Sequence, residues 1–242
     1  MTLIKLDSVA STNDYLKEMC KSQTCDDFTV VVAQTQTQGR GQRDSVWESE
    51  PDKNLTFSVL KNIEGMPLKD QFKLSMAVCL GVIEGLSFCQ YSGLKIKWPN
   101  DIMSGDKKLG GVLIENVITG QILKNCVIGI GINVNQIDFS RLPHATSLAL
   151  GSGKIISKDQ LLEQLRLSLE HRLTSIENQP FDPIKSDYLK ALYRFGALSE
   201  FQTPEGHFFN AVISGVDQAG QLELTHDNKS SLYDLKSVKM IY

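Results

Sequence analysis

The sequence feature that most limits the possible folds is a pair of long apolar segments joined by a short turn. Residues 109–118 (LGGVLIENVI) and 122–135 (ILKNCVIGIGINVN) are rich in β-branched residues and flank the turn sequence TGQ. This pattern predicts a β-hairpin at the centre of a sheet. The hairpin also carries glycines that mark places where another group approaches the backbone closely, namely Gly110, Gly111, Gly129 and Gly131.

Shorter patterns on both sides of the hairpin complete an α/β (α+β) fold. Apolar or alternating segments predict strands at 2–6, 28–33, 55–60 and 94–98. Apolar residues at three- and four-residue spacing predict helices at 11–21, 68–88, 159–178 and a further segment reaching about residue 195. After Gly196 the chain changes to short strands between the turn sequences PEG, DQAG and HDNKS, which is typical of a small β-barrel. We therefore predict two domains, 1–195 and 196–242.

The composition limits the classes of partner. The 242 residues carry 25 Lys and Arg against 28 Asp and Glu, mixed along the chain, so no basic patch indicates a nucleic-acid partner. The longest apolar runs, such as CVIGIGINV, are much shorter than the roughly 20 residues of a membrane span, and we see no charged-then-apolar leader at the start of the sequence. The five cysteines include no Cys-x-x-Cys pair, which argues against a disulfide framework or a zinc site. We expect a cytoplasmic protein with neither a membrane nor a nucleic-acid partner.

A polar loop follows the predicted strand at 28–33 and reads QTQTQGRGQRDSVW from Gln34 to Trp47. Glycines let the backbone approach a ligand, and arginines suit carboxylate and phosphate oxygens, so such a loop can hold an anion. The loop lacks the Gly-Lys-Ser/Thr ending of a Walker A loop and does not fit Gly-x-Gly-x-x-Gly. Its composition alone supports an anion-binding loop and a flexible solvated connector equally.

Two further segments place polar residues next to predicted strands. In KIKWPNDIMSGDKKLGG, a proline turn brings together Lys97, Asn100 and Asp101, and Lys108 precedes the glycine pair. These residues can place a phosphate-binding cation beside oxygen ligands for Mg²⁺, although an ordinary Asx turn also explains Asn100 and Asp101. The segment GIGINVN, with Asn133, matches only half of a dinucleotide fingerprint and fits a strand beneath a flat ligand, or simply a tightly packed strand.

Five motifs in one order carry a resemblance to a known family. STN at 11–13, QTxxxGRG followed by Trp47, KWPND, KKLGGVLIE and GIGINVN follow one another as in biotin protein ligases. The resemblance spans Ser11 to about Ser147, with weaker agreement beyond. It implies a catalytic domain similar to class II aminoacyl-tRNA synthetases, with a central mixed or antiparallel sheet, and a small C-terminal SH3-like β-barrel. It also implies the class that has no N-terminal DNA-binding domain.

The resemblance implies a reaction and the residues that perform it. An enzyme of this family uses ATP to activate biotin as biotinyl-5′-AMP and transfers it to a lysine of a biotin carboxyl-carrier protein domain, with Mg²⁺ as cofactor and a homodimer as a possible state. The implied biotin-binding residues are Ser11, Thr12, Asn13, Gln34, Gly39, Arg40, Gly41, Gln42, Lys108, Gly111 and Gly131. The implied ATP-binding residues are Trp47, Lys97, Asn100 and Asn133, and the implied metal ligand is Asp101. The implied catalytic cations are Lys108, Arg40 and Arg43.

The glycine-rich loop departs from the family's usual GRGRRGR. Gln42 stands where arginine is usual, and Arg43 and Asp44 follow it. We favour the interpretation that Arg43 supplies the missing charge; the alternative is a loop that retains the intermediate less tightly. Because the loop lacks core residues, we expect bound ligand to order it and the ordered loop to keep water from the reactive anhydride.

Two other functions remain open on the sequence. A lipoate ligase shares the fold and the acyl-adenylate chemistry, but lipoate gives no role to the STN motif and its glutamine. A ligand-binding regulator without catalytic activity is the second alternative, and the presence of Lys108 and KWPND argues against it.

Overall fold

The computed structural model describes residues 2–42, 45–89, 91 and 93–241. Its main feature is a seven-stranded sheet in the order β1-β2-β3-β7-β6-β5-β4, with β1 and β2 parallel and the other neighbours antiparallel. The strands are β1 (Leu3–Val9), β2 (Val30–Gln36), β3 (Leu55–Pro67), β4 (Leu94–Lys97), β5 (Asp101–Ser104), β6 (Lys107–Thr119) and β7 (Ile122–Ile132). The sheet is therefore mixed, and the predicted hairpin, β6–β7, lies in its interior with β7 at the centre.

Several strands differ from the prediction. β1 continues past the expected end at residue 6 to Val9, and β2 runs from Val30 to Gln36, into the segment expected to be a loop. β3 continues past Leu60 to Pro67 and pairs with β7 across a register shift between Asn62 and Met66. The prediction also lacks β5, which pairs with both β4 and β6. β5 has only four residues and follows the proline turn directly, so the sequence pattern does not separate it from that turn.

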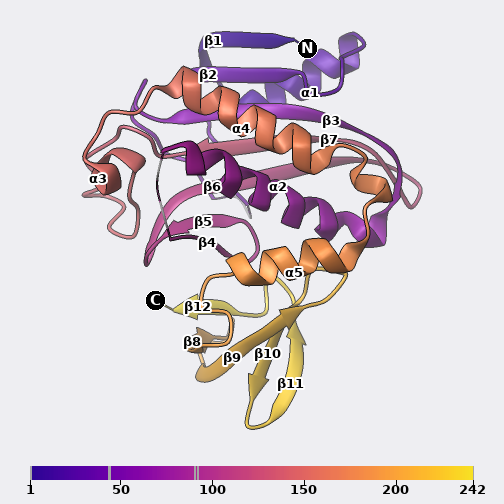
Figure 1. Ribbon diagram of the computed structural model, residues 1–242, viewed down its shortest axis with the longest axis vertical. Coiled ribbons are helices and arrows are strands. Elements are labelled where there is room, and N and C mark those ends of the chain that lie inside the picture. Colours follow the sequence, from indigo (N-terminus) through magenta and orange to yellow (C-terminus); the bar gives the residue numbers. More distant parts are fainter. Residues whose placement is uncertain (1, 43–44, 90, 92, 242) are drawn as a thin grey trace.

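Helices cover both faces of this sheet (Figure 1). On one face, α2 (Gln71–Leu86) and α4 (Lys158–Leu173) form the main core with the strands, and α5 (Phe181–Ala191) packs against α2. On the other face, α1 (Thr12–Ser22) buries Leu16 against Val31, Leu60 and Val127. The remaining short helices are η1 (Leu68–Asp70), η2 (Ser87–Cys89), α3 (Leu148–Ser152) and η3 (Ile176–Asn178).

The predicted helices are present with altered ends. The helix expected at 68–88 is α2 with a 3-10 turn at each end. The helix expected at 159–178 stops at Leu173, because Ser175 adopts a left-handed backbone conformation with φ of 52° and the chain resumes as a separate turn.

One helical run has the length and composition of a membrane span. It extends from Leu68 to Cys89, and polar residues interrupt its apolar stretches, which is why a search for unbroken apolar runs misses it. In the fold, 67% of its most apolar window is buried inside the molecule. We therefore interpret this run as the core helix of the larger sheet.

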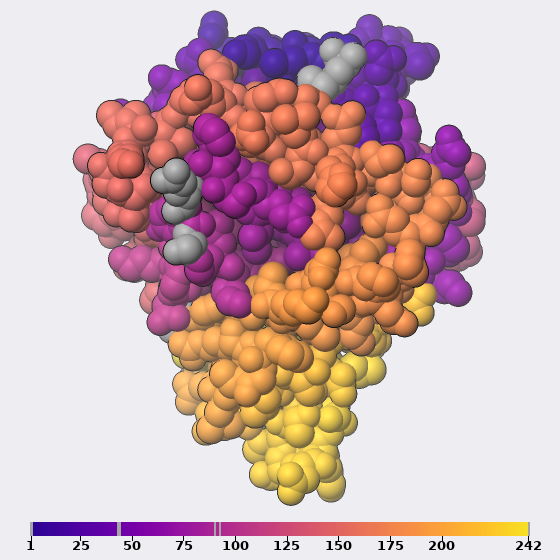
Figure 2. Space-filling view, viewed as in Figure 1, coloured from indigo at the N-terminus to yellow at the C-terminus, as the bar shows by residue number. Residues whose placement is uncertain are grey.

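The C-terminal part forms a second, five-stranded antiparallel sheet in the order β11-β10-β9-β8-β12. Its strands are β8 (Leu198–Gln202), β9 (Phe208–Val216), β10 (Leu222–His226), β11 (Lys229–Tyr233) and β12 (Lys239–Ile241). This small sheet forms the narrow end of the molecule (Figure 2). Trp98 Nε1 donates a hydrogen bond to the carbonyl of Gly220 at 2.9 Å and joins the two sheets. The division into 1–195 and 196–242 stays a proposal.

Close packing of α2 on α4 gives a test of the core. A Cβ atom added to Gly85 would lie 2.7 Å from Leu165 Cα, whereas one added to Gly81 would first meet Leu169 Cδ2, at 3.3 Å. Overpacking costs about 1–3 kcal/mol of the free energy of unfolding, and a contact with backbone at 2.7 Å places the cost of Gly85→Ala at the upper end of this range. This loss should exceed the gain of roughly 1 kcal/mol that alanine usually has over glycine in a helix.

Gly81→Ala is the matched control in the same helix, because the end of a leucine side chain can move where backbone cannot. Chemical denaturation of the two variants measures both effects. A Gly85→Ala protein as stable as the unchanged one would contradict the packing argument.

Candidate functional site

A cavity of about 340 Å³ lies where several elements of the fold converge. Its floor is formed by the glycine-bearing parts of β6 and β7, and around it stand the start of α1, the loop after β2, the turn before β5 and the second sheet. The predicted site residues that line it are Ser11, Thr12, Asn13, Arg40, Gly41, Gln42, Trp47, Lys97, Asn100, Asp101, Lys108, Gly111 and Gly131. Residues from separate motifs thus meet in one cavity.

The start of α1 forms a polar end of the cavity. Ser11 caps the helix, and its Oγ accepts a hydrogen bond from the Asp14 backbone N at 3.4 Å. Thr12 donates to Gln36 Oε1 from its backbone N at 2.8 Å and from Oγ1 at 3.1 Å. Ser58 Oγ lies 2.7 Å from Thr12 Oγ1 and 2.6 Å from Asn13 Oδ1. These buried groups form one connected hydrogen-bond network.

The structure brings Gln36, rather than the predicted Gln34, to this network. Gln34 is exposed, and it does not line the cavity. Gln36 is the last residue of β2, and its side chain meets the start of α1. The pair Gln-Thr occurs twice in succession, at 34–35 and 36–37; the motif QTxxxGRG begins at the first pair, whereas the glutamine of the second pair lines the cavity. The position of each glutamine along the strand decides which one reaches the cavity.

Three other predicted residues also lie apart from the cavity lining or outside the described chain. Gly39 supports the loop, because its carbonyl accepts a hydrogen bond from the Trp47 backbone N at 3.0 Å. The Asn133 side chain donates from Nδ2 to the carbonyl of Thr146 at 3.0 Å and is 5% exposed, so it braces the segment after β7. Arg43, and with it the predicted compensation for Gln42, lies outside the described residues.

Lysines from β4, β6 and β12 give another part of the cavity a positive character. Lys108 Nζ forms an ion pair with Asp101 Oδ1 at 2.6 Å. Backbone hydrogen bonds from Lys108 N to His144 O at 2.7 Å, and from Thr146 N to Lys108 O at 2.9 Å, fix the position of Lys108 on β6. Asp101 is the one acidic residue in the described part of the lining, which also contains Lys97 and, from the second sheet, Lys239.

The environment of Lys97 reflects this concentration of charge. Burial lowers the pKa of Lys97 below its ordinary value, and the nearby ammonium groups of Lys108 and Lys239 act in the same direction, while Asp101 acts against them. Net lowering means that the protonated lysine is held at a free-energy cost, which an anion would relieve. This part of the cavity is therefore suited to a ligand with several negative charges.

Asn100 has a structural role in the turn before β5. Its side-chain Nδ2 donates to the carbonyl of Val112, and the Val112 backbone N donates to the carbonyl of Asn100 at 3.1 Å. These two bonds hold the turn against β6. Asn100 lines the cavity, but its amide nitrogen already has a partner within the protein.

Trp47 and Gly131 explain one of the glycines in the floor. A Cβ atom on Gly131 would lie only 2.5 Å from Trp47 Cε2, so any larger residue would push the indole away from β7. Trp47 Nε1 is buried and has no hydrogen-bond acceptor among the described residues. An unsatisfied buried donor beside a cavity favours binding of a ligand oxygen.

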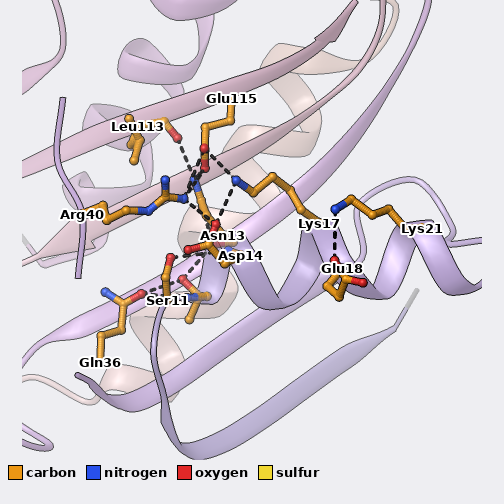
Figure 3. A network of polar contacts seen from close by, with 12 residues as sticks. Ser11, Asn13, Asp14, Lys17, Glu18, Lys21, Gln36, Arg40, Leu113 and Glu115 are labelled. Carbon is orange, nitrogen blue, oxygen red and sulfur yellow. Dashed lines mark hydrogen bonds and ion pairs between the residues drawn. The ribbon is translucent and has the colours of Figure 1, made fainter. Parts of the chain in front are cut away.

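Arg40 lies at the polar end of the cavity, where it contacts two carboxylates (Figure 3). Its Nη2 lies 2.6 Å from Asp14 Oδ1 and 3.0 Å from Glu115 Oε2. Lys17 Nζ also contacts both acids, at 2.9 Å and 2.8 Å respectively. The guanidinium charge of Arg40 is thus already balanced within the protein.

The second sheet supplies residues that the motifs do not contain. These residues are Phe201, Leu222, Leu235, Val238, Lys239 and Met240. They lie 66 to 105 residues beyond Asn135, the end of the last motif, in short strands and in the turn between β11 and β12, and these segments show no functional pattern of their own. Only the docking of the two sheets identifies them.

The fold and the site together define a class of α/β protein that is similar to solved biotin protein ligases. The structure of biotin protein ligase from Aquifex aeolicus in complex with biotin and ATP aligns with a TM-score of 0.81 and 26% identity, over 99% of this chain and 98% of that chain. The model of the Biotin/lipoate A/B protein ligase family matches residues 6–133. The chain belongs to this family.

Characterised relatives cover most of the chain. The bifunctional ligase/repressor BirA of Bacillus subtilis is 30% identical over 236 residues, which are 96% of this chain and 72% of that protein. The biotin--[acetyl-CoA-carboxylase] ligase of Mycobacterium tuberculosis is 27% identical over 224 residues, which are 90% of this chain and 82% of that protein. These matches extend beyond the motifs into the second sheet.

Proposed function

We propose that the protein is an ATP-dependent biotin ligase. In the first step, a biotin carboxylate oxygen attacks the α-phosphorus of ATP and pyrophosphate leaves, which gives biotinyl-5′-AMP. In the second step, a lysine amine of a biotin carboxyl-carrier domain attacks the acyl carbon and releases AMP. The observation that carries the proposal is one cavity with an uncharged hydrogen-bonding end at Ser11–Asn13 and Gln36 and a lysine-rich end at Lys97 and Lys108.

The polar end suits the ureido ring of biotin. Gln36 Oε1 is occupied by two hydrogen bonds from Thr12, so its Nε2 remains as the donor for a ligand carbonyl. Asn13 Oδ1 accepts from Ser58 and has a second lone pair for a ligand N–H. A ureido group presents one carbonyl and two N–H groups, and its burial is favourable only when these are paired.

The lysine-rich end suits the two anions that must react. A carboxylate and a polyphosphate repel each other, so fixed cations are needed before they reach attack distance. Lys108 is held by backbone hydrogen bonds on both its N–H and its carbonyl, and its ammonium lies inside the lining of the cavity. We assign Lys108 to the reacting carboxylate and α-phosphate, and Lys97 to the phosphates of ATP.

The residues present also fit the Mg²⁺ that accompanies ATP in this chemistry. Mg²⁺ keeps several waters and binds through one or two carboxylates together with substrate phosphates. Asp101 is such a single carboxylate beside the lysines. Asp101 would hold the ion, which when bound supplies positive charge to the phosphate oxygens.

Protection of the anhydride follows from the walls of the cavity. The hairpin-like loop around Arg40 is closed by hydrogen bonds from Gly41 N to Ser45 O at 2.7 Å and from Trp47 N to Gly39 O at 3.0 Å. The apolar residues of the second sheet stand at another wall. The loop and the apolar wall would both exclude water from the intermediate. We also predict that bound ligand orders the loop; limited proteolysis with and without biotin and ATP tests this prediction.

The free thiols of all five cysteines suit the cytoplasm, where we place the reaction.

The direct test is incubation with Mg-ATP and a carrier domain, read by intact mass. Biotin should add one biotinyl group to the carrier domain, and lipoate should add nothing. A lipoylated product would instead identify a lipoate ligase. Tight binding of biotin without any pyrophosphate release would identify a regulator that lacks the catalytic step.

Lys108 and its neighbour Lys107 form a matched pair for mutation. Lys108 lines the cavity, whereas Lys107 is exposed and stands outside the lining. We expect Lys108→Gln to slow biotin-dependent pyrophosphate release about 10- to 100-fold, the range that one charge-assisted hydrogen bond supplies. Lys107→Gln should leave the rate unchanged. Equal rates of pyrophosphate release for the two variants would contradict a role for Lys108 in the reaction.

The lowered pKa of Lys97 predicts a pH effect on ATP affinity. A lowered pKa means that Lys97 loses its proton at a lower pH than an ordinary lysine, so ATP affinity should fall as the pH rises through that value. Arginine stays protonated, so Lys97→Arg should shift this fall to higher pH. The measurement is the KM for ATP between neutral and alkaline pH. Parallel profiles for the two proteins would contradict the assignment.

A further inference from the structure

Glu115 is a contact point between the start of α1 and the glycine-rich loop (Figure 3). It lies on β6, and its side chain is 24% exposed. Its Oε2 accepts a hydrogen bond from Asn13 Nδ2 at 2.7 Å, and its Oε1 accepts one from Lys17 Nζ at 2.8 Å. Arg40 Nη2 donates to the same carboxylate, at 3.2 Å and 3.0 Å from its two oxygens.

The carboxylate is kept ionised by these partners. Burial acts to raise the pKa of Glu115, but the hydrogen bonds from Lys17 and Asn13 and the charges of Lys17 and Arg40 outweigh it, so the pKa is lowered. An ionised carboxylate accepts hydrogen bonds and donates none. Whatever faces Glu115 must therefore be a donor.

This requirement fixes the orientation of the Asn13 amide. The Nδ2 group must face Glu115, where it also lies 3.4 Å from the carbonyl of Leu113. Oδ1 is then directed to the opposite side, where Ser58 Oγ lies 2.6 Å away and where a Cβ atom on Gly129 would come within 2.4 Å. The same Cβ atom would also come within 2.9 Å of Asn13 Cγ and 3.0 Å of Nδ2, so the whole amide rests on the floor of the cavity. Since Nδ2 is used by Glu115, Oδ1 is the amide atom left to meet a ligand.

We infer that Glu115 is a positioning residue for biotin recognition, which acts by holding the Asn13 amide with its oxygen toward the ureido N–H of the ligand. The inference rests on the proposed function. The contact between Glu115 and Arg40 also places the beginning of the glycine-rich loop against the same carboxylate. A neutral side chain at 115 would weaken the preference, because an amide can donate or accept and only the more distant Leu113 carbonyl would still require Nδ2 on that side.

The competing explanation is that Glu115 only holds Lys17 and Arg40 in place and does not orient Asn13. The other ion pairs of these two cations distinguish the explanations. Asp14 also pairs with Lys17 and Arg40, so both cations keep a carboxylate partner when Glu115 is neutralised. Asn13 has no second acidic partner in the described part of the chain. The specific effect of the substitution should therefore pass through Asn13.

The test is a double-mutant cycle on biotin affinity, measured by calorimetry without ATP. Glu115→Gln should weaken biotin binding about tenfold, the size of one charge-assisted hydrogen bond. In an Asn13→Ala background the same substitution should change affinity less than twofold, because the group it positions is gone. Glu18→Gln is the control: Glu18 lies in α1 and forms an exposed ion pair with Lys21 at 3.0 Å, and its neutralisation should leave affinity unchanged.

The outcomes separate this inference from the proposed function. An equal loss of biotin affinity in both backgrounds, or no loss in either, would overturn the positioning role of Glu115. The proposed ligase function would still stand if the unchanged protein binds biotin. Failure of the unchanged protein to bind biotin would overturn both. If Glu115→Gln does not fold, as judged by thermal denaturation, Glu115→Asp enters the same cycle, since its shorter side chain keeps the charge and withdraws it from Asn13.

Discussion

The cavity exists because the centre of the large sheet gives up side chains where two other elements approach it. Gly129 leaves room for Asn13, and Gly131 leaves room for the indole of Trp47. A methyl group at either position would lie within 2.6 Å of its neighbour, which no core relaxation of a few tenths of an ångström accommodates. The helix start and the loop therefore each reach the sheet through one side chain, which lies directly on glycine backbone.

On this floor the charges are sorted by position. Asp14, Lys17, Arg40 and Glu115 form a balanced cluster at the polar end, so no net charge faces an uncharged ligand ring there. At the lysine-rich end Lys97, Lys108 and Lys239 outnumber Asp101. A ligand with a neutral head and an anionic tail consequently has one favourable orientation. The separation of charge thus supplies direction, while the hydrogen-bond network supplies selectivity.

The sequence predicts the long elements and 13 of the 30 residues that line the cavity. The central hairpin and the core helix are found where the patterns place them, because hydrophobic period is a local property. From Ser11 to Lys108, eleven predicted residues line the cavity, whereas Gln34 and Gly39 do not. Features that depend on strand pairing across the sheet cannot be predicted from such local patterns. Strand geometry selects Gln36 over Gln34, sheet pairing creates β5, and the hydrogen bond to Thr146 turns Asn133 into a brace. Residues of the second sheet reach the cavity only through tertiary docking.

The chain contains two tryptophans, Trp47 and Trp98, and both line the cavity. One indole rests on the sheet with its N–H unpaired among the described residues, and the other is tied to the small sheet through Gly220. Their ultraviolet emission therefore arises entirely from the walls of the site. One fluorophore lies on the loop side of the cavity and the other on the side of the second sheet. The tryptophan fluorescence of the protein therefore reports ligand binding in the cavity without an attached dye.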